Sequence, residues 1–274
     1  MGSGGQILAG SCIFEENPLS FGVGEFSNIP PLTMFNSVQL VSMRLHHFIG
    51  SWLDPDAVVI DLGANRGYFA QEVHAAYGCT CYAIEAMPDL YAAIPPTEKI
   101  RPFHYAIAAN NQPITFNVSD QEESGSVHHL PTAMITETIT VPGITLTQFM
   151  ADQGIDQVDL LKVDIEGAEI DLFQTLPDQT LGKIKQIAVE FHDFLDYFED
   201  DGAIAAIKTR LEALGFVCIV YSLTCHADVL FINRALAPLS PWDYFYLGKV
   251  DKYRRGITHG IRWRLEKLLG REGA

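Results

Sequence analysis

The sequence is poor in basic side chains and has no long apolar run. Its 18 Lys and Arg residues stand against 34 Asp and Glu residues, which gives a formal net charge of −16. Because an acidic protein repels phosphates, we expect no nucleic-acid substrate or partner. No segment approaches the ~18 consecutive apolar residues of a membrane-spanning helix. The first residues also lack the basic start and apolar stretch of a signal peptide.

Cysteine is scarce as well. The five cysteines are odd in number and none forms a Cys-x-x-Cys pair: Cys12, Cys79, Cys81, Cys218 and Cys225. This usage excludes a disulfide framework and predicts reduced thiols in a cytoplasmic protein.

What the chain does have is apolar content of 48% over 274 residues, enough for one large α/β domain with appendages. We expect an N-terminal arm and cap helix at 1–52, a main domain at 53–235 and a C-terminal extension at 236–274. Apolar residues at helical spacing predict the cap helix after Thr33: Met34, Val38, Val41, Leu45, Phe48 and Trp52. His46 and His47 would then point to different faces of that helix, as solvated side chains.

The segment Val58–Phe69 organises the rest of the chain. Three apolar residues lead into Asp61, then Gly63 and Gly67 stand four residues apart before a helical apolar pattern. This order predicts a buried strand, a tight turn and a helix whose N-terminus can receive a ligand. A dinucleotide fingerprint would need a second glycine where Asn65 stands. The Asp-x-Gly-x-x-x-Gly spacing is instead typical of methyltransferases that use S-adenosyl-L-methionine (SAM).

A second predicted strand, 79–84, ends on Glu85. A carboxylate at that point can accept hydrogen bonds from both ribose hydroxyls of a nucleoside. Met87, which follows closely, is expected to lie against the purine.

Further strands are predicted over 100–107, 158–164, 184–192, 216–221 and 228–232, the last two as a hairpin. The alternating run Ile114, Phe116 and Val118 predicts an antiparallel addition, and a helix is expected from Thr145.

Polar side chains gather at the ends of two of these strands. Lys162 and Asp164 share one strand face, because side chains alternate along a strand, and Glu166 and Glu169 follow. Glu190 and His192 form a second pair with the same spacing. The dipole of a following helix is a sufficient reason for Glu169, whereas Asp164, Glu166, Glu190 and His192 are predicted site residues.

From about Asp56 to Asn233 the chain resembles the FkbM family of SAM-dependent methyltransferases. The resemblance rests on Ile60–Phe69, on Ile84-Glu85, on the Lys-x-Asp-x-Glu-Gly-x-Glu segment Leu161–Glu169 and on Val189-Glu190. Ala86 departs from the family, which usually has proline there.

The resemblance implies an α/β fold, a Rossmann-like class I methyltransferase sandwich. Its seven-stranded sheet would be mostly parallel, with the last strand antiparallel. It implies methyl transfer from SAM to a hydroxyl of a sugar, glycan or secondary metabolite. Gly63, Asn65 and Gly67 would hold the methionine end, Glu85 the ribose, and Asp164 would lie near the reacting centre. The full set of predicted cofactor contacts is Asp61, Gly63, Ala64, Asn65, Gly67, Tyr68, Phe69, Glu85, Ala86, Met87, Ala106 and Asp164.

A hydroxyl becomes a good nucleophile when a base removes its proton. We predict His192 as that base, oriented by Glu190, with Asp164 or Glu166 as alternatives. In a second hypothesis Asp164, Glu190 and His192 hold a divalent cation that lowers the pKa of the hydroxyl. An NAD-dependent oxidoreductase and a non-catalytic interaction module remain open on the same fold.

The C-terminal residues reverse the charge balance, with eight basic against three acidic residues in 249–274. An apolar stripe at helical spacing predicts a basic amphipathic helix: Ile257, Ile261, Leu265, Leu268 and Leu269. We expect residues 256–271 to dock on the acidic domain or form a homo-oligomer contact, with peripheral membrane binding as the alternative. Aromatic residues 242–246 are expected to anchor the extension.

Overall fold

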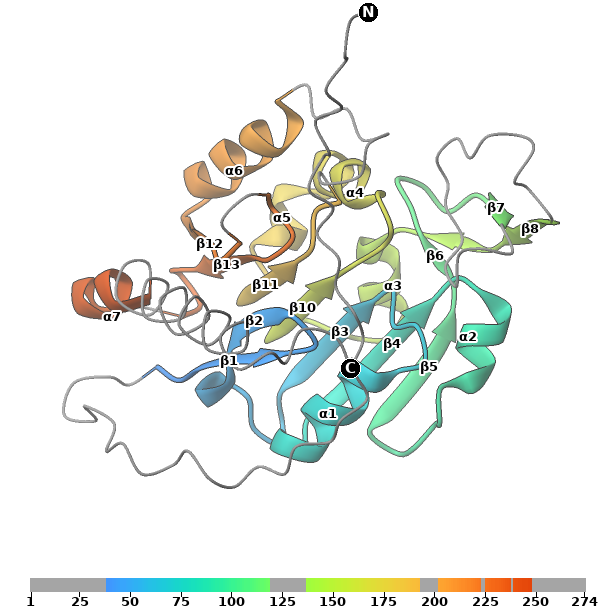
Figure 1. The fold of residues 1–274 in the computed structure, drawn as a ribbon, viewed down its shortest axis with the longest axis horizontal. Helices are drawn as coiled ribbons and strands as arrows, with labels where there is room; N and C mark the ends of the chain where they lie inside the picture. Colours follow the sequence, from blue (N-terminus) through green and yellow to red (C-terminus); the bar gives the residue numbers. More distant parts are fainter. Residues whose placement is uncertain (1–37, 119–136, 193–201, 223–224, 238, 248–274) are drawn as a thin grey trace, which may run out of the picture. The chain divides into compact units, whose positions relative to one another are not determined.

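The computed structural model describes residues 38–118, 137–192, 202–222, 225–237 and 239–247, all within one compact unit, Ser37–Ala274. Its centre is a seven-stranded sheet of order β12-β13-β11-β10-β3-β4-β5 (Figure 1). The strands are β3 (Val58–Leu62), β4 (Thr80–Glu85), β5 (Ile100–His104), β10 (Leu160–Val163), β11 (Gln186–Val189), β12 (Phe216–Val220) and β13 (Val229–Asn233). β13 runs antiparallel to both of its neighbours, and the other pairings are parallel. The expected α/β class, the strand number and the antiparallel last strand are confirmed.

Helices cover both faces of this sheet, which is why its central strands are apolar on both sides apart from Asp61 and Lys162. On one face α1 (Tyr68–Tyr77) packs Phe69 and Val73 against β3 and β4. On the other face the apolar core includes residues of four helices: α3 (Leu146–Asp152), α4 (Glu169–Thr175), α5 (Asp178–Leu181) and α6 (Ala203–Ala213). The short α2 (Pro88–Ala93) follows β4. The helix expected at Thr145 is confirmed, because the Thr145 side chain accepts a hydrogen bond from the Gln148 amide and caps α3.

The predicted cap helix is wrong over the residues that the structure describes. Residues 40–49 form a β-hairpin of β1 (Leu40–Met43) and β2 (His46–Ile49), and a 3₁₀ turn, η1 (Gly50–Trp52), follows. Tertiary contacts decide the conformation: the Gln186 side chain bonds both backbone groups of Ile49, at 2.8 and 3.2 Å, and Phe48 is fully buried. In so short a segment the apolar spacing fits both the helical period of ~3.6 residues and the strand period of ~2 residues.

The turn of this hairpin is unusual for its residue types. Arg44 and Leu45 both have positive φ, 46° and 67°, as a two-residue type I′ turn requires. Asn and Gly normally occupy such positions, so the hairpin holds its tip in a conformation that these side chains disfavour.

A small insertion stands beside the main sheet. The strand predicted over 100–107 is divided in the structure, because β5 ends at His104. The residues that follow form β6 (Ala106–Ile107), which leaves the main sheet and pairs in parallel with β9 (Gly143–Ile144). β7 (Ile114–Val118) and β8 (Glu137–Val141) form the antiparallel pair that the alternating pattern predicts. Residues 119–136, which connect β7 to β8, lie outside the described residues.

After β13 the chain forms α7 (Pro241–Phe245), capped by Ser240 and Asp243. Of the aromatic residues expected to anchor this segment, Tyr244 packs on an apolar cluster that includes Leu247, whereas Trp242 is 74% exposed. The amphipathic stripe at 256–271 lies outside the described residues, so its contact stays a prediction, as do the three domain boundaries. None of the described helices is long and apolar enough to cross a membrane.

Candidate active site

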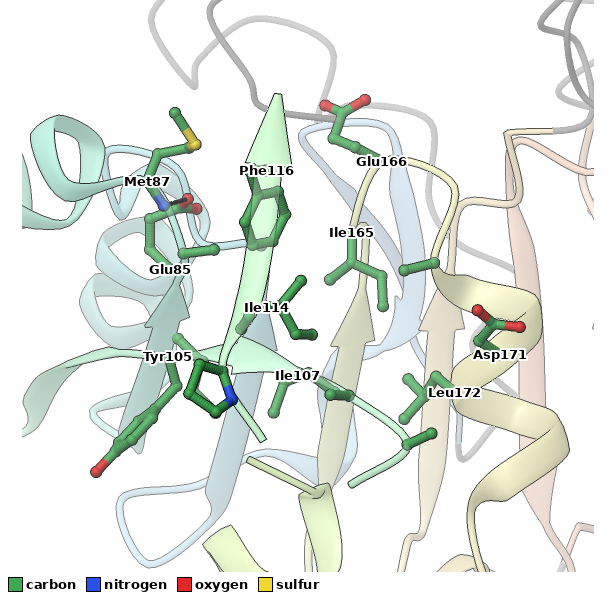
Figure 2. Close-up of a pocket in the computed structure, with 18 of the residues that line it drawn as sticks. Glu85, Met87, Tyr105, Ile107, Ile114, Phe116, Ile165, Glu166, Asp171 and Leu172 are labelled. Carbon is green, nitrogen blue, oxygen red and sulfur yellow. Dashed lines mark hydrogen bonds between the residues drawn. The ribbon is translucent and has the colours of Figure 1, made fainter. Parts of the chain in front are cut away.

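A cavity of about 530 Å³ opens at the carboxyl ends of β3, β4 and β10, the edge at which open α/β sheets bind ligands. Figure 2 shows Glu85 and Met87 on one side, Asp171 and Leu172 of α4 on the other, and Ile114 and Phe116 of β7 between them. Predicted cofactor contacts that line it are Gly63, Asn65, Glu85, Ala86, Met87, Ala106 and Asp164. The predicted contacts outside its lining are Asp61, Ala64, Gly67, Tyr68 and Phe69.

The glycine turn after β3 brings two strands' ends together. Gly63 has a φ of +72°, and a Cβ added there would lie 1.7 Å from the carbonyl oxygen of Asp164. Only glycine therefore allows the β3 turn to contact the end of β10. Gly67 acts differently, because it begins α1 in the left-handed conformation, where an added Cβ would meet the Ile94 side chain at 2.7 Å.

Glu85 is fixed by backbone amides at the mouth of this turn. Its Oε2 accepts a hydrogen bond from Asn65 N at 2.8 Å, and its Oε1 accepts one from Met87 N at 2.7 Å. Burial raises the pKa of Glu85, and the two amides oppose that shift in part. Each oxygen retains a lone pair, so the carboxylate can still accept hydrogen bonds from two ligand hydroxyls.

A buried ammonium lies beneath the site. Lys162 Nζ lies 3.2 Å from Asp61 Oδ1 and 3.2 Å from Asp164 Oδ2, and it donates to the Gly63 carbonyl at 2.7 Å. Burial alone would lower the pKa of Lys162, but the two carboxylates outweigh it and raise that pKa. Asp61 is fully buried and faces this ammonium. It therefore holds Lys162 in place rather than the ligand.

Asp164 lies at the centre of the polar groups. Burial would raise its pKa, but Lys162, His46 and His192 outweigh that effect and hold the pKa of Asp164 well below its usual range. It is therefore ionised at neutral pH.

Glu169 holds His192, which corrects the expectation that Glu190 orients the imidazole. His192 Nδ1 lies 3.0 Å from Glu169 Oε1, and the fully buried Glu169 also accepts from the amides of Ile165 and Gly167. β11 ends at Val189, so the two-residue alternation stops before His192 and its ring turns toward α4. Sequence reasoning missed Glu169 as a site residue, although the Lys-x-Asp-x-Glu-Gly-x-Glu spacing contains it.

The other ring nitrogen of His192 faces the site. Its Nε2 lies 3.4 Å from Glu166 Oε2 and 3.7 Å from Asp164 Oδ1. Burial would lower the pKa of His192, but Glu169, Glu166 and Asp164 outweigh it and raise the pKa to about 9. Glu166 has a left-handed φ of 53°, a strained conformation that is common where a structure positions functional groups.

Glu190 is not the hydrogen-bond partner of His192, a role that Glu169 has. Burial, with the neighbouring charge of Asp164, raises the pKa of Glu190 to about 7.

His46 reaches the same centre from the N-terminal hairpin. It is only 3% exposed, and its Nε2 lies 3.6 Å from Asp164 Oδ2. The expectation that it is solvated is wrong, because a strand turns consecutive side chains to opposite faces of the hairpin. His47 turns the other way, toward Asp228 and the ring of Tyr221. No local signal marks His46 in the sequence.

Two groups of potential metal ligands meet at Asp164. The ligand atoms of His46, Asp164 and Glu190 lie within 4.8 Å of one another, and so do those of Asp164, Glu166 and His192. The predicted set of Asp164, Glu190 and His192 is not one of the groups found among the described residues. The hairpin supplies the imidazole that the sequence assigns to His192.

The chain matches a methyltransferase family model and is similar to proteins named as methyltransferases. A family model described as the methyltransferase FkbM domain matches residues 61–218. The chain is 28% identical to 2-O-methyltransferase NoeI of Sinorhizobium fredii, over 71% of this chain and 87% of that protein. It is 24% identical to 31-O-demethyl-FK506 methyltransferase FkbM of Streptomyces tacrolimicus, over 62% and 76%. Among solved structures, M. capricolum TrmK with bound S-adenosylhomocysteine aligns with a TM-score of 0.39 at 10% identity, over 82% of this chain and 85% of that one.

Proposed function

The chain belongs to the FkbM family of methyltransferases, and we propose that it transfers a methyl group from SAM to a hydroxyl of a sugar, glycan or secondary metabolite. The family match supports methyl transfer. Two relatives are named for methylation at oxygen, one as a 2-O-methyltransferase and one for a 31-O-demethyl substrate. No observation favours the alternatives of an NAD-dependent oxidoreductase or an interaction module.

The observation that carries the proposal is the Glu85 carboxylate in the cavity. Two backbone amides fix both of its oxygens, so a ribose can bind without reorganising the side chain. The cavity volume of about 530 Å³ lies in the range of small-molecule sites. Met87 and Ile107 line it with apolar surface suited to a purine, and the ionised Asp164 at its end suits a sulfonium.

His192 is the proposed base for the acceptor hydroxyl. When bound, SAM supplies an electrophilic methyl group on a positively charged sulfur. A neutral His192 would accept the proton of the acceptor hydroxyl at Nε2, which would make that oxygen the nucleophile for methyl transfer. Glu169 holds Nδ1 as the donor, which makes Nε2 the nitrogen that accepts the proton and stabilises the imidazolium that forms.

The neutral state of His192 must be produced in the complex. In the uncomplexed protein the surrounding carboxylates keep the imidazole protonated, since its pKa is raised to about 9. A cation bound beside Asp164 compensates those carboxylates and favours loss of the proton. The geometry of Glu169, His192 and Asp164 thus couples proton removal to binding of a cationic cofactor.

Calorimetric titration with SAM and with S-adenosylhomocysteine tests the proposal. We expect saturable binding by the wild type and at least tenfold weaker binding by Glu85→Gln, on the order of what lost charge-assisted hydrogen bonds cost. Glu98→Gln is the matched control, because Glu98 is exposed and does not line the cavity. A folded wild type that binds neither compound would refute the proposal.

A further inference from the structure

Methyl transfer as described assigns no role to two polar side chains of the site, one of them buried and the other partly buried. His46 is 3% exposed, and its Nδ1 has no hydrogen-bond partner among the described residues. Its Nε2 points at Asp164, at 3.6 Å. The Glu190 carboxylate is also mostly buried, and within the described part of the chain no hydrogen bond or ion pair holds it. Buried polar groups without partners are rare and often mark a missing ion or water.

The two side chains flank the same carboxylate. His46 comes from the hairpin, Asp164 from the end of β10 and Glu190 from the end of β11, and their ligand atoms lie within 4.8 Å of one another. Metal–ligand bonds of ~2.0–2.2 Å place ligand atoms up to ~4.4 Å apart. We propose that His46, Asp164 and Glu190 bind a divalent transition-metal cation.

Charge supports this assignment. Lys162 lies 3.2 Å from both Asp61 and Asp164, and His192 lies 3.0 Å from Glu169. Apart from the more exposed Glu166, these two cationic side chains face four carboxylates, those of Asp61, Asp164, Glu169 and Glu190. Two negative charges are therefore in excess, and a doubly charged ion neutralises them. An imidazole ligand favours first-row transition metals over Mg²⁺, which prefers oxygen ligands alone.

The second group, Asp164, Glu166 and His192, is the weaker site. His192 already has a partner at Nδ1 in Glu169, and its Nε2 lies 3.4 Å from Glu166. These groups satisfy one another without an ion, whereas His46 and Glu190 do not.

The inference deepens the proposed function and rests on it for its catalytic meaning. Asp164 lines the cavity, so a cation held there can bind the acceptor hydroxyl and lower its pKa. His192 lies on the other side of Asp164, at 3.7 Å, where it can receive the released proton. The metal would bind the oxygen while the imidazole removes the hydrogen.

Manganese titration followed by electron paramagnetic resonance tests the site without any methyl acceptor. The full chain is stripped with a chelator and titrated with Mn²⁺, and the signal of free Mn²⁺ reports binding. We expect one saturable Mn²⁺ per chain, and at least about tenfold weaker binding in His46→Ala and in Glu190→Gln. His74→Ala, on α1 outside both groups, is the matched histidine control and should bind as the wild type does.

His192→Gln separates the two groups of ligands. It should retain Mn²⁺ binding if His46, Asp164 and Glu190 form the site. Loss in His192→Gln with retention in His46→Ala would overturn the assignment, and so would a wild type without saturable binding. Circular dichroism checks the fold of each variant; if His46→Ala does not fold, the nearly isosteric Glu190→Gln decides. Binding of S-adenosylhomocysteine is measured separately, so failure of the methyltransferase proposal and failure of the metal site are distinguishable.

Discussion

The two halves of the active site are built in different ways. On the cofactor side, Glu85 accepts from the amides of Asn65 and Met87, so one strand–helix–strand unit, from β3 to just past the end of β4, supplies the carboxylate and both donors. On the catalytic side, Asp164 meets His46 of the hairpin and His192 beyond β11, each from a separate segment. The first half is held by hydrogen bonds within that unit. The second depends on tertiary structure, and among the described residues it includes a buried nitrogen, His46 Nδ1, without a hydrogen-bond partner.

This difference suggests a division of roles. A half fixed by backbone amides offers the same contacts to any nucleoside, so we expect it to bind the proposed SAM cofactor. A half assembled from three segments changes whenever one of them changes, so we expect it to bind the acceptor, because substrate choice varies with such loops and caps.

The largest expected effect comes from replacing His192, which changes the catalytic half and leaves the cofactor half intact. We expect His192→Gln to lower methyl transfer by on the order of 10²–10⁴-fold, the usual contribution of a general base. SAM binding should be retained or strengthened, because the neutral Gln removes a positive charge that opposes the cationic cofactor. The measurements are transfer to a hydroxyl acceptor found by screening and calorimetric SAM binding on the same preparation. Glu169→Gln should lose less, because the imidazole remains and only its orientation is weakened. Full transfer by His192→Gln would assign proton removal to another group.

The next largest effect is expected from removing Lys162, the side chain that connects the two halves. Lys162 pairs with Asp61 of the glycine motif and with Asp164 of the catalytic group. Lys162→Met leaves the fully buried Asp61 without its counter-charge, which should cost about 3–5 kcal/mol of unfolding free energy. Chemical denaturation measures this.

Two further variants sharpen that result. Adding Asp61→Asn to Lys162→Met should recover part of the loss, because the uncompensated charge is then gone. Lys185→Met removes a more exposed ammonium paired with Asp159 at 3.3 Å and should cost about 1 kcal/mol or less. Equal losses in Lys162→Met and Lys185→Met would show that the buried pair has no special role.

The difference between the two halves also explains which site residues could be predicted from the sequence and which could not. Gly63, Asn65 and Glu85 line the cavity, as the order of a strand, a turn and a strand end predicts from local rules, and their contacts with a cofactor stay a prediction. The number of strands in the sheet and the antiparallel β13 follow from the family resemblance. The sequence presents Glu169 as a helix-terminus acid, although it is fully buried on His192. The apolar neighbours of His46 fit a helical period, while contacts with Gln186 hold it in a strand. Such errors arise where distant segments decide the local conformation.

The smallest expected effect concerns the tip of the hairpin that carries His46. Leu45 has a φ of 67° and is 55% exposed, so its side chain adds strain and little burial. Leu45→Gly should raise the unfolding free energy by about 1 kcal/mol, the cost of a left-handed conformation for a residue with a Cβ. Met43→Gly, in β1, is the control and should destabilise. If Leu45→Gly lowers stability instead, Leu45 makes a stabilising contact that outweighs its strain. If it raises stability but weakens Mn²⁺ binding, the strained turn is what holds His46 against Asp164.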